Sequence, residues 1–198
     1  DAIPLPPNFE NPPGPDSHLR ARANHLRWKK RYTDERQWRE LRARYWGLCS
    51  EVDTHAGRIL DTLDELGLAD NTLVVFTSDH GDMMGSHQLV AKTVMYQEAV
   101  RVPMLVRLPG QSAQRRVSGP VSQVDLVPTL LELMGQDVPA DLEGQSLAPL
   151  MDNGGGSDRD VIIEWNGSDG AEAQRPDMVA DLCTPEQYAR AMSDSVRT

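Results

Sequence analysis

Two residues that can bind a cation stand shortly after an apolar run. Asp79 and His80 follow Leu73–Phe76 and precede Gly81. A carboxylate oxygen and an imidazole nitrogen can hold a divalent cation if other segments complete the coordination shell. Such a site favours calcium, with manganese and magnesium as alternatives. The other interpretation is a polar turn in which Asp79 caps the next element and His80 is merely exposed, and the spacing alone does not decide between them.

The elements around this pair predict an α/β fold. Leu73–Phe76 is rich in Val and flanked by polar residues, which indicates a strand buried on both faces, as in a parallel sheet. Ligands bind beyond the carboxyl ends of strands in open α/β sheets, so the pair would lie at a functional edge. Further strands are predicted within Arg101–Pro109, where Pro103 indicates a first residue or an edge, and at Val161–Trp165.

A long helix is predicted before the first strand. Thr33 can cap it, and Gly67 suits the left-handed position that ends a helix. Apolar residues recur between them at steps of three and four, which predicts one continuous apolar stripe. The stripe comprises Trp38, Leu41, Tyr45, Leu48, Val52, Ala56, Ile59, Leu63 and Leu66. Shorter helices are predicted within Thr93–Val100, at Asp125–Gly135 with Asp125 as cap, at Leu147–Met151 and after Thr184.

Composition sets limits on the partners. The net charge of -10 and the pI near 4.9 argue against nonspecific binding to nucleic acid or to an anionic membrane. A small anionic substrate is still compatible, because a bound cation can reverse the local field. Cys49 and Cys183 are too few for a disulfide scaffold, which leaves the compartment open.

The chain divides into three segments. Residues 1–32 are rich in proline and then in basic residues, and we expect them to wrap over a neighbour, with the basic part as a solvated helical face. Residues 33–150 carry the periodic elements and form the core. Residues 151–198 form a polar carboxy-terminal extension that we expect to be truncated.

Five separated segments resemble the sulfatase family of the alkaline phosphatase superfamily, over about residues 30 to 150. They are Glu51–Leu60, Leu73–Asp82, Lys92 with Tyr96–Arg107, Asp125–Leu131 and Leu142–Leu147. The Asp79–His80 pair with Lys92 soon after it is most similar to the branch of phosphonate monoester hydrolases and choline-sulfatase-like enzymes. The resemblance implies an alkaline-phosphatase-like sandwich with a mostly parallel central sheet flanked by helices.

The resemblance also implies a metal-dependent hydrolase of sulfuric, phosphonic or phosphoric monoesters. In the family one divalent cation holds a hydrated formylglycine, made from Cys or Ser in a Cys/Ser-x-Pro-x-Arg motif. Asp79 and His80 match two cation ligands, and Lys92 matches the lysine that neutralises the transferred group's oxygens. His87 is expected to contact the substrate or to stiffen the loop. Without the resemblance, Lys92 would be taken as an ordinary surface lysine.

The nucleophile motif and the paired acidic ligands of the family have no match in these 198 residues. Cys183–Gln187 begins like the motif, but Gln187 stands where its arginine belongs, and we regard the likeness as coincidental. We therefore expect an internal fragment that lacks the family's amino-terminal half, needs that half as its partner and is inactive alone. The alternatives are a phosphodiesterase or phosphomutase relative, which would need further histidine ligands, and a non-catalytic binding domain of the same fold.

Overall fold

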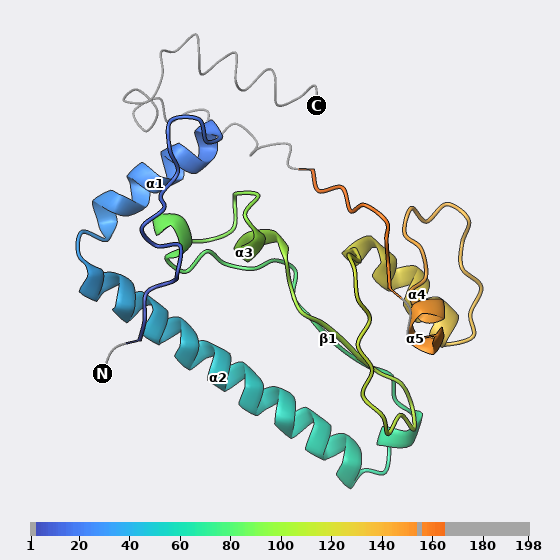
Figure 1. Ribbon diagram of the computed structural model, residues 1–198. Helices are drawn as coiled ribbons and strands as arrows, with labels where there is room; N and C mark the ends of the chain where they lie inside the picture. Colours follow the sequence, from blue (N-terminus) through green and yellow to red (C-terminus); the bar gives the residue numbers. More distant parts are fainter. Residues whose placement is uncertain (1–2, 154–155, 165–198) are drawn as a thin grey trace. The chain divides into compact units, whose positions relative to one another are not determined.

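The computed structural model describes residues 3–153 and 156–164 (Figure 1). These residues form two compact units, 3–110 and 111–164, which are treated separately. The predicted helix after Thr184 and the Cys183–Gln187 segment lie outside the described residues. Among the described helices, none combines the length and the apolar character that crossing a bilayer requires.

The first unit opens with an extended segment and helix α1 (Leu19–Arg31). The segment is anchored on the start of the next helix: Arg39 donates a hydrogen bond to the Ile3 carbonyl at 2.9 Å, and buried Phe9 packs edge-on against Trp38 with ring centroids 5.6 Å apart. The path of this segment beside the helices is visible in Figure 1.

Helix α2 (Glu35–Glu65) is the long helix that the periodicity predicts. Its N-cap is Asp34, whose carboxylate accepts from the Gln37 amide at 2.9 Å, so the prediction of Thr33 is wrong by one residue. Thr33 instead donates its amide to the Gln37 side chain at 2.7 Å. Gly67 has the expected positive φ of 64°, which confirms the predicted end of the helix.

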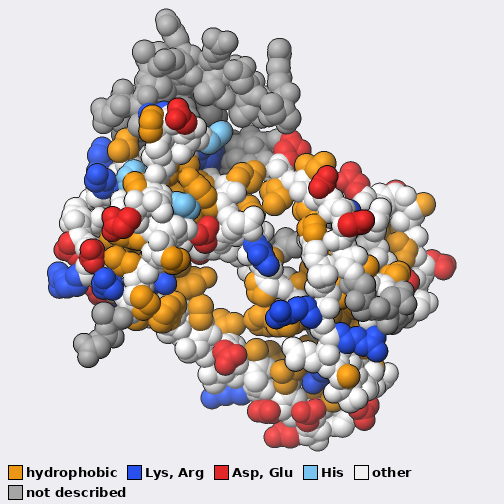
Figure 2. All heavy atoms as spheres, in the orientation of Figure 1, with side chains coloured by type: hydrophobic (Ala, Val, Ile, Leu, Met, Phe, Trp, Pro, Cys, Tyr) orange, Lys and Arg blue, Asp and Glu red, His pale blue; other side chains and the backbone are white. Residues whose placement is uncertain are grey.

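The apolar stripe of α2 is largely exposed. Trp38 is buried, but Leu48, Val52, Ile59 and Leu66 keep 59%, 56%, 64% and 65% of their surface exposed. Figure 2 shows hydrophobic side chains on the face of the molecule that it draws. The described residues therefore leave four of the nine stripe residues largely uncovered.

The sheet in the described residues differs from the prediction. Strand β1 (Val74–Thr77) pairs antiparallel with β2 (Met104–Arg107), and Phe76 lies opposite Leu105. The two side chains are 41% and 60% exposed. The predicted mostly parallel sheet, buried on both faces, is thus not formed by the described residues, because an apolar run records the need for burial and not the direction of the neighbouring strand. Strand β2 lies within the predicted segment, directly after Pro103.

The third predicted strand is wrong over its described part. Val161–Glu164 forms neither helix nor strand, and Ile162 and Ile163 are 92% and 51% exposed. Trp165 lies outside the described residues. A short apolar run needs a neighbouring strand to complete its backbone hydrogen bonds, and the described residues supply none here.

Between β1 and β2 the chain forms the core of the first unit. The regular elements of this connection are a 3-10 turn, η2 (Ser86–Gln88), and helix α3 (Gln97–Val100). Another 3-10 turn, η1 (Ala69–Asn71), comes directly before β1. The helix predicted within Thr93–Val100 thus forms only over the second half of that range. Met83, Leu89 and Ala99 are almost fully buried and pack together, with Trp28 of α1 against them.

The second unit contains η3 (Gln123–Asp125), α4 (Leu126–Leu133) and α5 (Ala148–Asn153). Asp125 is fully buried and accepts hydrogen bonds from the amides of Ser122 and Gln145, both at 2.9 Å, and from Arg159. It does not cap α4 with its side chain as predicted, because its carboxylate closes a capping box with Ser122 one turn earlier. Pro128 lies in the first turn of α4 as expected.

Candidate active site

The connection from β1 to β2 carries all the predicted site residues. Asp79 and His80 follow β1 directly, and the His80 amide donates to Asp79 Oδ1 at 3.0 Å. The Asp79 side chain is 82% exposed. Slight desolvation raises the pKa of Asp79, but the hydrogen bond from the His80 amide, the nearby imidazole, its own amide and the Ser78 hydroxyl together lower that pKa below its ordinary value. Asp79 is thus an accessible carboxylate whose lowered pKa favours the charged form.

The tautomer of His80 is set by its neighbour. Nδ1 lies 2.8 Å from the Gly81 carbonyl oxygen, which can only accept, so Nδ1 carries the proton and donates it. In the neutral ring with its proton on Nδ1, Nε2 presents a lone pair. It lies 3.2 Å from Asp79 Oδ2 and 2.7 Å from Lys92 Nζ. The structure thus brings Asp79, His80 and Lys92 together at one point.

This donor set suits a cation in part. A carboxylate oxygen and an imidazole lone pair 3.2 Å apart repel each other unless a positive group lies close. The Lys92 ammonium is such a group and already contacts His80 Nε2. Among the described residues, no group of three or more His, Cys, Asp and Glu side chains could hold a metal ion. Asp79 and His80 would therefore be two ligands of a shell that other segments complete.

The loop between His80 and Lys92 is tightly built. The Gly81 amide donates to the Ala99 carbonyl at 2.8 Å, and a side-chain carbon on Gly81 would lie 1.9 Å from the Glu98 carbonyl oxygen. Only glycine permits this approach of two backbones. Asp82 then accepts hydrogen bonds from two amides of the loop through one carboxylate oxygen. Asp82 thus caps this loop.

His87 lies at the far end of this loop. Its Nδ1 donates to the Asn11 carbonyl at 2.6 Å, its Nε2 accepts from the Asn8 amide at 3.1 Å, and its ring stacks on Tyr96 with centroids 4.3 Å apart. Asn8 also donates to Glu98 at 2.6 Å. Both ring nitrogens thus face the amino-terminal segment, an arrangement that suits loop stiffening more than substrate contact. Nothing in the sequence pointed to Asn8 or Glu98, because Asn8 stands 79 positions from His87 and 90 positions from Glu98.

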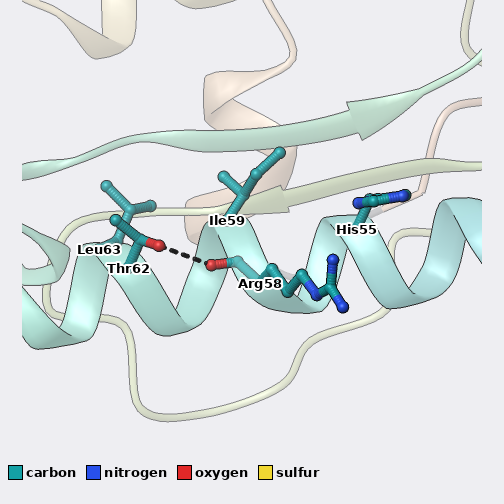
Figure 3. Close-up of a pocket in the computed structure, with 5 residues that line it drawn as sticks. All are labelled: His55, Arg58, Ile59, Thr62 and Leu63. Carbon is teal, nitrogen blue, oxygen red and sulfur yellow. Dashed lines mark hydrogen bonds between the residues drawn. The ribbon is translucent and has the colours of Figure 1, made fainter.

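A separate shallow groove lies along α2 and is lined by His55, Arg58, Ile59, Thr62 and Leu63 (Figure 3). The hydrogen bond drawn there joins the Thr62 hydroxyl to the Arg58 carbonyl, within the helix. All five lining residues belong to α2, so no second described element brings a polar group to the groove. The groove shares Ile59 and Leu63 with the apolar stripe and contains none of the candidate site residues.

Comparison with known proteins relates the chain to one family. The sequence model of the Sulfatase family matches residues 17–136. The multifunctional alkaline phosphatase superfamily protein PehA of Trinickia caryophylli is 39% identical over 127 residues, which are 63% of this chain and 25% of that protein. Arylsulfatase K of Xenopus laevis is 40% identical over 117 residues, 59% of this chain and 22% of that protein.

Solved structures give the same result. The phosphonate monoester hydrolase of Silicibacter pomeroyi superposes with a TM-score of 0.67 at 31% identity, over 87% of this chain and 37% of that one. A protein solved in complex with its substrate, D-glucosamine-2-N,6-O-disulfate, superposes with a TM-score of 0.58 at 35% identity, over 64% of this chain and 26% of that one. The chain therefore has the α/β fold of these proteins and spans about a quarter of the length of the curated relatives it matches.

Proposed function

The chain belongs to the sulfatase family, and from this membership we propose that it supplies part of the active site of a metal-dependent hydrolase of sulfuric, phosphonic or phosphoric monoesters. The observation that carries the proposal is the meeting of Asp79, His80 and Lys92. Lys92 Nζ lies 2.7 Å from His80 Nε2, and Asp79 Oδ2 lies 3.2 Å from it. A lone-pair nitrogen, a charged carboxylate and an ammonium suit the binding of a cation next to an anionic group.

Each of the three residues has a definite task in this proposal. Asp79 and His80 hold the cation through Oδ2 and Nε2, and the hydrogen bond from Nδ1 to Gly81 keeps the His80 lone pair available. A divalent cation, with calcium preferred over manganese and magnesium, would act there as a Lewis acid. Lys92 binds the oxygens of the transferred group, on which negative charge accumulates in the transition state.

The remaining parts of the reaction are proposed to come from polypeptide outside residues 1–198. These are the formylglycine nucleophile and the other acidic ligands that the family uses. The chain matches only 22% to 25% of the length of its curated relatives, which leaves ample room for them. The activity is thus a property of the complete polypeptide, and residues 1–198 alone would not turn over.

The exposed residues of the α2 stripe also support a contact with polypeptide outside residues 1–198. Leu48, Val52, Ile59 and Leu66 each expose more than half of their surface, an arrangement that a soluble helix seldom keeps. We propose that the rest of the catalytic domain covers this stripe. The substrate is proposed to be a small anionic sulfate or phosphonate ester, consistent with the disulfated sugar in one related structure and with the names of the relatives. No observation favours the phosphodiesterase or binding-domain alternatives.

The test is to replace Asp79 and His80 with Ala, one at a time, in the complete polypeptide. We expect both the bound metal, measured by mass spectrometry of the elements, and the turnover of sulfate and phosphonate esters to fall together. Asp70→Ala is the matched control, because Asp70 is exposed in η1. Unchanged metal content in Asp79→Ala and His80→Ala would rule out the assignment of this pair.

A further inference from the structure

One carboxylate oxygen joins the two ends of the loop that separates His80 from Lys92. These two ends, at Asp82 and Ala91, are called the neck of the loop. Asp82 Oδ1 accepts hydrogen bonds from the amides of Met84 and Ala91, both at 3.0 Å. The Met83 amide also donates to the Ala91 carbonyl at 2.9 Å. Asp82 stands two residues after His80, and Ala91 stands directly before Lys92. A single side chain therefore joins the two backbone segments that carry the metal ligand and the lysine.

The backbone at the neck needs such a restraint. Ala91 has a φ of 68°, in the left-handed region that residues with a side chain rarely adopt. Met84, His87 and Gln88 also have positive φ values of 38°, 55° and 55°. A strained conformation persists only where the surroundings hold it. The hydrogen bond from the Ala91 amide to Asp82 supplies this restraint at the residue that sets the direction of Lys92.

The far side of the loop is fixed independently. Met83 and Leu89 are each 1% exposed and pack in the core of the first unit. Arg42 of α2 donates to the Met84 carbonyl at 3.0 Å. The loop body is therefore anchored without Asp82, whereas the exit toward the exposed Lys92 is held at Ala91 by Asp82 and by the hydrogen bond from the Met83 amide.

We propose that Asp82 is a positioning residue that holds Ala91 in its left-handed conformation and thereby fixes the direction in which the Lys92 side chain leaves the loop. This inference rests on the proposed function, in which Lys92 binds the oxygens of the transferred group. Asp82 itself touches neither His80 nor Lys92 through any hydrogen bond in the structure of the described residues. Its effect on the reaction is transmitted through the backbone of Ala91.

The test is a double-mutant cycle in the complete polypeptide, with Asp82→Ala, Lys92→Ala and the two combined. We expect Asp82→Ala to lower kcat on the order of 10²-fold, as a small misplacement of a catalytic group can do, with a smaller change in KM. The double variant should be about as active as Lys92→Ala alone, because Asp82 acts through Lys92. Losses of activity that simply multiply would overturn the proposal.

Two conservative variants separate position from charge. Asp82→Asn keeps an oxygen acceptor at the same place without the charge, and Asp82→Glu keeps the charge but moves the acceptor by one methylene. We expect Asn to retain more of kcat than Glu, and the reverse order would overturn the proposal even if Asp82→Ala failed to fold. Asp61→Ala, at an exposed position of α2, is the control. If Lys92→Ala leaves kcat unchanged, the proposed function fails; if only the Asp82 variants leave it unchanged, this inference alone fails.

Discussion

His80 Nε2 and Lys92 Nζ lie 2.7 Å apart, although the two residues are twelve positions apart in the sequence. His80 Nδ1 donates a hydrogen bond to the Gly81 carbonyl, and in this tautomer of the neutral ring the Lys92 ammonium can donate to the lone pair of Nε2. An imidazole that could ligate a cation and an ammonium that could bind an anion thus occupy one point of the surface. This relationship is the physical basis of the predictions about catalysis.

Lys92→Ala in the complete enzyme should lower kcat by about 10²- to 10³-fold, the usual cost of removing one donor that stabilises transition-state charge. Lys92→Arg should recover part of the loss, because it keeps the charge but replaces the compact ammonium with a planar group. Steady-state kinetics on a sulfate ester measures both. Lys30→Ala, at an exposed position of α1, is the control, and an equal effect at Lys30 would show that only general surface charge matters.

Gly81→Ala should destabilise the loop that carries the site. The new side-chain carbon would lie 1.9 Å from the Glu98 carbonyl oxygen, so one of the two backbones must move. The matched control is Gly47→Ala in α2, where no atom lies within 4 Å of the new carbon. Because glycine is a poor residue inside a helix, Gly47→Ala should raise the free energy of unfolding by about 0.5–1 kcal/mol. Thermal unfolding measures both variants, and a Gly81→Ala protein as stable as the parent would contradict the close approach of the Gly81 and Glu98 backbones.

His25 should make the stability of the first unit depend on pH. Burial lowers the pKa of His25 below its ordinary value of 6.5, Lys29 lowers it further, and the hydrogen bond with the Gln88 backbone only partly opposes them. The Nδ1 atom is buried and has no hydrogen-bond partner among the described residues, so a second proton there would lack an acceptor. The unfolded chain therefore binds the proton more readily. Stability should be fully present above pH 6.5 and decline as the pH falls below it.

The measurement is the Tm of the protein between about pH 5 and pH 8, the range in which histidines titrate. His25→Gln should flatten the acidic side of the profile. His55→Gln is the control, since His55 lies on the exposed face of α2 with a side chain that is 58% exposed. A profile that flattens equally in both variants would show that His25 is not the responsible group.

Asp125→Ala should strongly destabilise the second unit. Asp125 is fully buried and pairs with Arg159, and its carboxylate also holds the amides of Ser122 and Gln145. Removing one partner of such a buried pair costs about 3–5 kcal/mol, because the other charge is left uncompensated. Urea denaturation gives the free energy of unfolding. Asp160→Ala, at an exposed position, should change it little, and similar losses in the two variants would contradict the structural role of Asp125.

Local chemistry was readable from the sequence wherever neighbouring residues decide the structure. The period of the apolar residues predicted α2, and Gly67 marked its end because only glycine adopts a positive φ without cost. The family and the pairing of Asp79 with His80 after a strand were likewise visible in contiguous segments. The cap was misplaced by one residue because the side chains of both Thr33 and Asp34 can cap a helix.

Contacts between distant segments were not readable in this way. An apolar run predicts burial but is silent on strand direction, so the antiparallel pairing of β1 with β2 and the absence of a strand at Val161–Glu164 were decided by tertiary structure. The same holds for His87, whose partners Asn8 and Asn11 come from the other end of the first unit.

The sequence by itself thus determined that Asp79 and His80 could bind a cation, because residue type fixes which atoms can coordinate, and its resemblance to a family pointed to Lys92 as the group that could bind an anion. Only the tertiary structure decided that Lys92 meets His80 and that Asp82 closes the loop between them. The physical reason is that a hydrogen bond such as the one from the Ala91 amide to Asp82 depends on where the folded backbone returns, and a left-handed φ at an alanine leaves no mark in the sequence.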